Sequence, residues 1–202
     1  EQKLDLTQAA VEPDALLQEI VGYTSELKLS PRGGNSGSIV WRLNQVNSFK
    51  DFSKQLKPVR FPESDPLKRF SEIILGLFAE AQEFTMLHAL TTCQALRTLL
   101  PYVSDPKVTL SAYWHSVCAS YVTVRRMPQF ATAKQAAPTG GSDWNSITRK
   151  AAEHDATIHE SQFVHRVKLV YSCMQEFKHE PRDLYRAIAS REVEKASEIV
   201  WG

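Results

Sequence analysis

The sequence predicts an all-α protein, an antiparallel bundle of about six to eight helices. Apolar residues recur at spacings of three and four over long stretches, which places them on one side of a helix. Proline or aspartate stands where several of these stretches begin, as at Pro13, Asp65 and Asp105. No stretch alternates apolar and polar residues convincingly, as a half-buried strand does. The pattern therefore indicates helices that pack in antiparallel pairs around a shared core.

The composition is that of an ordinary globular protein. The chain has 202 residues, of which 43% are hydrophobic and 23% charged, and its formal net charge is +1. This balance gives no electrostatic reason to bind nucleic acid or a membrane surface, so neither is an expected partner. No run of about 18 apolar residues is present, and the N-terminus lacks the pattern of a signal peptide. We expect a single all-α domain over 1–202, located in the cytoplasm.

The N-terminal part, 1–65, is expected to be largely irregular. Pro13 opens one candidate helix, and its apolar face consists of Leu16, Leu17, Ile20 and Val21. The stretch 30–38 holds three glycines and is predicted as a flexible loop. Residues 39–56 are ambiguous between strand and helix, and the spacing of their apolar residues favours a helix in the second half. Three prolines make 57–66 an extended linker.

The segment 66–202 is predicted to be the helical core. Asp65 fits the N-cap of its first helix, with Pro66 at the first helical position and the end near Gln82. A loop is predicted over 127–142, where two prolines and a glycine pair occur. The other predicted helices cover 85–100, 106 to about 126, 144–154, 160–179, and a last one from 181. Ser142 or Asp143 is the expected cap of the helix 144–154.

Three cysteines, Cys93, Cys118 and Cys173, are each surrounded by apolar residues in a predicted helix. None lies within four positions of another, so the spacing of a zinc site is absent. We expect buried free thiols in a reducing compartment.

Two predicted helices carry histidines in apolar surroundings. His88 lies in the run FTMLHAL, and Phe84 and several small or hydroxyl-bearing residues share its side of the helix. That setting leaves room for a ligand or metal, although residue statistics alone favour a core histidine satisfied by a hydroxyl or carbonyl. His154 and His159 lie in a polar segment and are expected to be exposed. His115 can face either way, and His179 is favourably placed near a helix C-terminus.

His165 and Lys168 lie three positions apart, so they project from one side of the helix 160–179. The other residues of this helix are mostly apolar, and we expect it to be buried, which makes a lysine costly there unless it is neutral, paired or modified. A neutral amine is a base or a nucleophile, and it can also take up carbon dioxide to form a carbamate that binds metal. Alternatively, Lys168 reaches solvent or pairs with a carboxylate such as Glu160 or Glu176.

The stretch Arg69–Val103, with its FTMLHALT and ALRTLLPY segments, resembles the questin oxidase-like family of fungal and bacterial oxygenases. A second similarity lies in DWNSITRKAA, 143–152, and in the His-x-x-Lys of the following helix. Together these segments lie in roughly the last two-thirds of the chain, which therefore resembles the C-terminal portion of such an enzyme.

The resemblance implies a largely helical oxidoreductase of secondary metabolism. It implies an oxygenase that acts on an aromatic polyketide such as an anthraquinone or hydroquinone, inserts oxygen and cleaves a ring carbon–carbon bond. Some members are described as non-haem iron enzymes, with molecular oxygen as co-substrate and with histidines and a carboxylated lysine around the metal. If the family's site is transferred to this sequence residue by residue, its metal-binding and catalytic positions are those of His88, His165 and Lys168. Lys168 would be the carbamate.

One departure from the family concerns the number of ligands. Family members are usually longer, and further metal-binding histidines come from their N-terminal half, whereas residues 1–65 contain no histidine. A second chain or an N-terminal half is therefore an expected partner. Two alternatives stay open: a cofactor-free Baeyer–Villiger oxidase with His88 or His165 as base, and a non-catalytic all-α interaction module. The candidate walls of a substrate site are Phe84, Met86, Tyr113, Trp114 and Tyr121.

Overall fold

The computed structural model describes residues 10–24, 38–49, 52–62, 64–124, 142–153 and 160–194. Eight α-helices are found in this part of the chain, and its one bridge of strand type joins Val11 to Val59. The predicted all-α fold is therefore confirmed. The helices are α1 (Pro13–Thr24), α2 (Ile39–Ser48), α3 (Lys68–Ala81), α4 (Phe84–Leu99), α5 (Pro106–Val122), α6 (Trp144–Ala152), α7 (Glu160–His179) and α8 (Asp183–Glu194).

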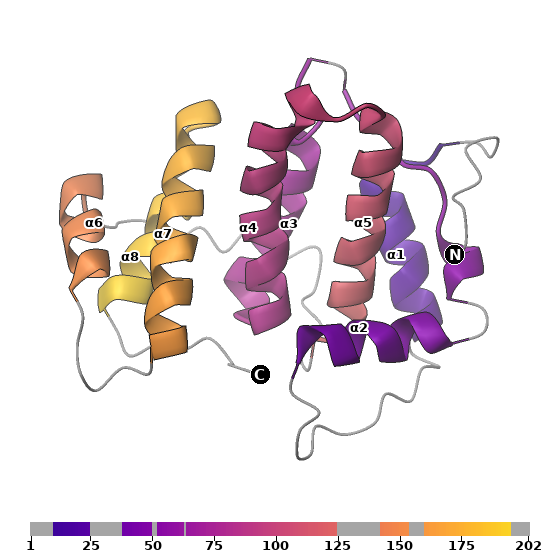
Figure 1. Ribbon diagram of the computed structural model, residues 1–202, viewed down its shortest axis with the longest axis horizontal. Coiled ribbons are helices and arrows are strands. Elements are labelled where there is room, and N and C mark those ends of the chain that lie inside the picture. The colour runs from indigo at the N-terminus through magenta and orange to yellow at the C-terminus, as the bar shows by residue number, and fades with distance from the viewer. Residues whose placement is uncertain are drawn as a thin grey trace.

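Helix α4 is the centre of the arrangement, because it packs against α3, α5 and α7 (Figure 1). Helices α6 and α8 pack against α7 on one side of the bundle, and α1 and α2 pack against α5 on the other. Helices α3 and α4 run antiparallel, since only a short turn joins them and Gln82 in that turn takes the left-handed conformation with φ of 48°. None of the described helices is both long and apolar enough to span a bilayer.

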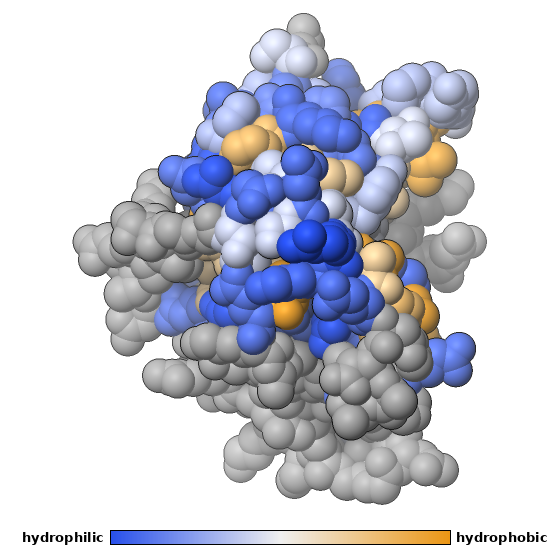
Figure 2. Space-filling view, turned by 90° about the vertical axis from the view of Figure 1, so that its left-hand side faces the viewer, coloured by the Kyte–Doolittle hydropathy of each residue, from blue (hydrophilic) through white to orange (hydrophobic). Residues whose placement is uncertain are grey.

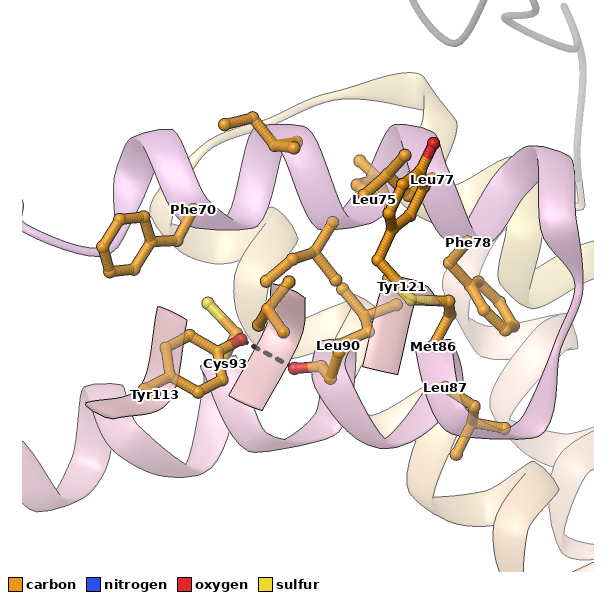
Figure 3. Close-up of a cluster of buried hydrophobic side chains, with 14 of the residues drawn as sticks. Phe70, Leu75, Leu77, Phe78, Met86, Leu87, Leu90, Cys93, Tyr113 and Tyr121 are labelled. Carbon is orange, nitrogen blue, oxygen red and sulfur yellow. Dashed lines mark hydrogen bonds between the residues drawn. The ribbon is translucent and has the colours of Figure 1, made fainter. Parts of the chain in front are cut away.

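The hydrophobic core lies chiefly between α3, α4 and α5. Phe70 stacks on Trp114 with ring centres 4.7 Å apart, and both side chains are fully buried. Figure 3 shows the side chains of α3 and α4 meeting along the length of the two helices, with Leu90 and Cys93 facing α3. All three cysteines are buried and free, as the sequence predicted.

Helices α4 and α7 run parallel to each other. His88 near the start of α4 contacts His165 near the start of α7, and Arg97 near the end of α4 pairs with Glu176 near the end of α7. Two helices far apart in sequence thus meet side by side, with an imidazole pair at one end and an ion pair at the other (Figure 1). This arrangement positions the candidate site.

Several helix ends follow the predicted capping chemistry. Asp105 caps α5 by accepting a hydrogen bond from the Val108 amide at 3.1 Å, and Asp143 caps α6 through two amides. Asp65 accepts from the amides of Leu67 and Lys68, so it caps the turn that leads into α3, which begins two residues later than predicted. Helix α7 matches its predicted bounds.

One expectation about the N-terminal part was wrong. The helix expected from Pro13 is present as α1, but the second helix of this part, α2, lies elsewhere than predicted. Within 39–56 the helix occupies the first half, not the second, because Ser38 caps it by accepting from the Trp41 amide at 3.1 Å. Among the described residues that follow in this stretch, Ser53–Gln55 form a short turn of 3₁₀ type. Of the predicted loops 30–38 and 127–142, residues 30–37 and 127–141 lie outside the described residues.

Helix α7 is also less buried than its sequence suggested. Leu169, Val170 and Cys173 face the core. Val164, Val167 and Tyr171, however, are 39%, 39% and 50% exposed. Because these three residues lie at spacings of three and four, they form an apolar stripe on the outer side of α7. The face of the molecule in Figure 2 is mostly hydrophilic, with separate small hydrophobic areas.

Candidate functional site

The candidate site is the pair of imidazoles from His88 on α4 and His165 on α7. Their ring centres lie 5.1 Å apart and the ring planes are inclined by 55°. Both side chains are half-buried, so they border the core while one side of the pair stays accessible to solvent. The two histidines that the sequence selected are therefore brought together by the parallel packing of α4 and α7. We call them the His88–His165 pair below.

The protonation of His88 is defined by one hydrogen bond. Its Nδ1 lies 2.9 Å from the carbonyl oxygen of Phe84, one turn earlier on α4. Because a carbonyl only accepts, Nδ1 carries the proton and donates it, and Nε2 is then the nitrogen with the available lone pair in the neutral ring. Burial is the largest influence and lowers the pKa of His88; the hydrogen bond to the Phe84 carbonyl raises it, and the electrostatic effects of His165 and Lys168 lower it, so the pKa lies below its usual value. These influences favour a neutral His88 whose Nε2 is a ligand or a base.

Phe84 completes a cluster of three rings. Its ring centre lies 4.4 Å from that of His88 and 4.8 Å from that of His165, and both contacts are edge-on. Phe84 is half-buried at the first residue of α4. One residue thus contacts both members of the His88–His165 pair, through its ring in both cases and also through its carbonyl in the case of His88.

Lys168 is exposed, which corrects the expectation that it is buried. The sequence suggested burial because most neighbours on α7 are apolar, but several of them lie on the outer side of the helix. Its charge lowers the pKa of His88, which places Lys168 in the electrostatic surroundings of the pair. Of the two alternatives to a buried amine, the structure agrees with a side chain that reaches solvent, and Glu176 is paired with Arg97 instead.

The donor set of the pair suits a transition metal. Two imidazoles that bind one ion through nitrogen at about 2.0–2.1 Å have ring centres roughly 5 Å apart, close to the spacing found here. A ligand histidine usually donates its other ring N–H to a carbonyl or carboxylate, as His88 does to Phe84. Within the described ranges, however, no group of three or more His, Cys, Asp or Glu side chains is placed to hold an ion. The residues thus fit two positions of a metal site.

The remaining histidines do not join the pair in the described part of the chain. His115 donates through Nε2 to the carbonyl of Lys57 at 3.0 Å, so it anchors the linker to α5, and burial lowers its pKa. His179 is exposed in the last turn of α7, the position that the sequence indicated. His154 and His159 lie outside the described residues.

Four of the five candidate wall residues belong to the packed core. Met86, Trp114 and Tyr121 are at most 1% exposed, and Tyr113 is 6% exposed. Tyr113 also donates its hydroxyl to the Ala89 carbonyl at 2.8 Å (Figure 3). Phe84, in contrast, contacts both members of the His88–His165 pair. The sequence selected the other four as large apolar or aromatic side chains near His88, but their helical positions direct them toward α3.

The Arg97–Glu176 ion pair was missed by sequence reasoning. Arg97 donates Nε and Nη2 to the two carboxylate oxygens of Glu176, each at 3.0 Å, and Nη1 to Asp65 at 2.8 Å. Glu176 is only 1% exposed. A signal was present, because a lone charge faces the apolar side of each helix, but the sequence cannot show that the two charges meet.

Comparison with known proteins agrees with the resemblance seen in the sequence. The family model described as questin oxidase-like matches residues 78–173. This segment begins in the last turn of α3 and includes Phe84, His88, His165 and Lys168. The searches of curated proteins and of solved structures gave no match. A questin oxidase-like match indicates an oxidoreductase.

Proposed function

We propose that this questin oxidase-like chain is an oxygenase that acts on an aromatic polyketide, an anthraquinone or the corresponding hydroquinone. The reaction would insert oxygen beside a ring carbonyl and cleave a ring carbon–carbon bond. One atom of dioxygen enters the product and the other leaves as water, so two electrons are needed. A reduced aromatic substrate or an external reductant supplies them.

The observation that carries the proposal is the approach of His88 to His165. Helices α4 and α7 hold the two imidazoles 5.1 Å apart, and the Phe84 carbonyl leaves Nε2 of His88 unprotonated. Nitrogen ligands of this kind suit iron(II). In this proposal His88 and His165 would hold the iron, and the iron would supply the binding and activation of dioxygen.

Lys168 is proposed as a third ligand after carboxylation by carbon dioxide. The exposed side chain is accessible to dissolved carbon dioxide, and its charge already acts on His88. The ammonium would first lose a proton, and the neutral amine would then attack carbon dioxide and release a second proton to solvent. Carboxylation would thus replace a positive charge by an anionic oxygen donor beside two imidazoles, and oxygen donors complement imidazole at iron. The carbamate would then offset the positive charge of the metal.

The protein residues around the pair would orient the substrate and exclude water. Phe84 supplies an apolar edge on which a flat aromatic ring can rest, since aromatic pairs favour edge-on and offset contacts. Buried Met86 and Leu87 fill the space behind this turn of α4, so water is excluded from the core side. The aromatic substrate would approach from the accessible side of the pair.

Two imidazoles and one carbamate do not complete the set of protein ligands proposed for the iron. We propose that a second chain or an N-terminal half supplies the missing ligands. The apolar stripe of Val164, Val167 and Tyr171 lies on the helix that carries His165. A segment that covered the stripe would bury apolar surface and would bring its own ligands close to the pair.

A second candidate function uses no metal. A neutral His88 with its lone pair on Nε2 is a general base, and burial keeps it neutral by lowering its pKa. Such a base would remove a phenolic proton, and the electron-rich substrate would itself transfer an electron to dioxygen. Turnover that survives exhaustive chelation would favour this route over the iron-dependent one.

The test of oxygenase activity is turnover with isotopically labelled dioxygen. Anthraquinone and hydroquinone substrates are incubated with the protein, and products are analysed by mass spectrometry for one labelled oxygen and an opened ring. His88→Gln and His165→Gln are expected to abolish product formation, whereas the exposed His179→Gln is expected to retain it. Full turnover in all three variants would remove the pair from the reaction.

A further inference from the structure

We infer that Phe84 is a positioning residue that holds His88 and His165 at their mutual distance and fixes which nitrogen of His88 is available. The inference rests on the proposed function, because it assumes that the pair acts as a unit on one ligand. It assigns to Phe84 a role beyond that of a substrate wall. Two separate parts of the residue carry the argument, the carbonyl and the ring.

The carbonyl of Phe84 selects the tautomer of His88. The 2.9 Å contact from Nδ1 requires the proton on that nitrogen, and the contact spans one turn of α4. A histidine that ligates a metal is usually oriented by such a bond from its second nitrogen, which fixes both tautomer and ring direction. Since the acceptor belongs to the backbone, its position depends on how firmly the first turn of α4 is held.

The first turn of α4 is held by its neighbours. Thr85, Met86 and Leu87 are all buried, and the hydroxyl oxygens of Thr85 and of Thr123, the residue that follows α5, lie 3.4 Å apart. The Leu87 amide donates to the Glu83 carbonyl at 3.0 Å, which closes the turn. The Phe84 backbone is therefore anchored to the core, while its side chain is half-buried and turned toward the two histidines.

The ring of Phe84 links the two helices at the site. It contacts His88 on its own helix at 4.4 Å and His165 on α7 at 4.8 Å, so the three ring centres form a nearly equilateral triangle with the 5.1 Å separation of the imidazoles. An imidazole side chain has rotamer freedom unless its ring is packed. With Phe84 in place, both imidazoles have a common neighbour that restricts their ring planes.

The experiment compares Phe84→Leu with the unaltered protein in two measurements that do not depend on turnover. Long-range ¹H–¹⁵N spectra of histidine-labelled protein report the tautomer of His88, and nuclear Overhauser effects report the proximity of the two rings. Titration with Co²⁺ alone reports metal affinity. We expect the unaltered protein to show His88 protonated on Nδ1 and an Overhauser effect between the rings.

Phe84→Leu is expected to weaken the Overhauser effect and to lower Co²⁺ affinity by about tenfold, the loss typical of residues that orient ligands. Phe84→Tyr keeps the ring and is expected to behave as the unaltered protein does. The matched control is Phe177→Leu, which removes a similar edge-on contact, with Trp144 at 5.5 Å, from the far end of α7. It is expected to leave both measurements unchanged. If Phe84→Leu does not fold, Phe84→Met takes its place.

The outcomes separate the inference from the function on which it rests. If the unaltered protein binds no Co²⁺ but Phe84→Leu loses the Overhauser effect, the positioning role holds and the metal proposal fails. If Phe84→Leu keeps the Overhauser effect and any Co²⁺ affinity of the unaltered protein, the positioning role is overturned. Protonation of His88 on Nε2, or no Overhauser effect in the unaltered protein, would overturn it as well.

Discussion

Arg97 and Glu176 form a two-point ion pair that joins α4 to α7 at the end remote from the two histidines. Both nitrogen–oxygen distances are 3.0 Å, and Glu176 is 1% exposed while Arg97 is 15% exposed. Because two parallel hydrogen bonds join the planar guanidinium to the planar carboxylate, one helix cannot shift along the other without breaking them. This contact therefore helps set the register of α4 and α7. The approach of His88 to His165 depends on the same register.

Replacement of Arg97 by methionine is predicted to lower the free energy of unfolding by about 3–5 kcal/mol, because it leaves the buried Glu176 carboxylate without its counter-charge. Urea unfolding monitored by circular dichroism measures this loss. The matched control is Arg186→Met, which breaks the exposed pair with Asp183 and is predicted to cost about 0–1 kcal/mol. Equal losses in the two variants would contradict a special role for the Arg97–Glu176 pair.

The stability of the fold is predicted to fall as pH drops below 6.5. Burial holds the pKa values of His88 and His115 below 6.5, the ordinary value of a histidine in an unfolded chain. Between 6.5 and these lower values the unfolded chain binds more protons, so protonation favours unfolding. The stabilisation is therefore complete above 6.5 and is lost as pH falls toward the folded-state pKa values.

Urea unfolding of the unaltered protein and of a His88→Gln, His115→Gln double variant, measured above and below pH 6.5, checks this dependence. The double variant is predicted to lose less stability over this interval. His179→Gln serves as the control, because His179 is exposed at the end of α7. A double variant whose stability changes with pH as much as that of the unaltered protein would refute the assignment.

Tyr113→Phe is predicted to affect stability and not substrate binding. The change removes a hydrogen bond to the Ala89 carbonyl at 2.8 Å in the core, at a cost of about 0.5–1.5 kcal/mol. Tyr102→Phe is the control, since Tyr102 is 86% exposed. Unfolding and steady-state kinetics of both variants give the answer. A raised KM with unchanged stability would place Tyr113 in a substrate wall after all.

Carboxylation of Lys168 predicts that metal affinity rises with bicarbonate concentration. Lys168→Arg keeps a positive charge but cannot form the carbamate of a primary amine, so its metal affinity is predicted to be insensitive to bicarbonate. Lys178→Arg on the exposed far end of α7 is predicted to keep the bicarbonate dependence of the unaltered protein. Titrations with Co²⁺ at low and high bicarbonate decide the point, and ¹³C-labelled bicarbonate should give a carbamate signal. No dependence in the unaltered protein would exclude the carbamate.

Much of the helical fold could be predicted because its signals are local. The bounds of α7 and the caps at Asp105 and Asp143 follow from residues close in sequence. The exception is α2, where a spacing of apolar residues over 46–56 suggested a helix that the Ser38 cap places earlier. The serine at position 38 and the apolar spacing over 46–56 indicate different starting points for this helix, and the apolar spacing alone did not identify the correct one.

The site was predictable only in part, because tertiary packing decides what meets. The selection of His88 and His165 from the family resemblance agrees with their contact in space. The exposure of apolar residues on α7 such as Val167 was not predicted, because the sequence does not show whether another helix packs against that side of α7. The contact of Phe84 with His165 likewise depends on the parallel packing of α4 and α7, which no local pattern encodes.

The most direct test of the central claim is the metal content and Co²⁺ affinity of the purified protein and its histidine variants. The unaltered protein is predicted to bind Co²⁺ and to retain iron when it is purified without oxygen. His88→Gln and His165→Gln are each predicted to lose Co²⁺ affinity by at least about tenfold, while His179→Gln retains it. Equal metal binding in all four proteins, or none in the unaltered protein, would contradict a metal site at the His88–His165 pair.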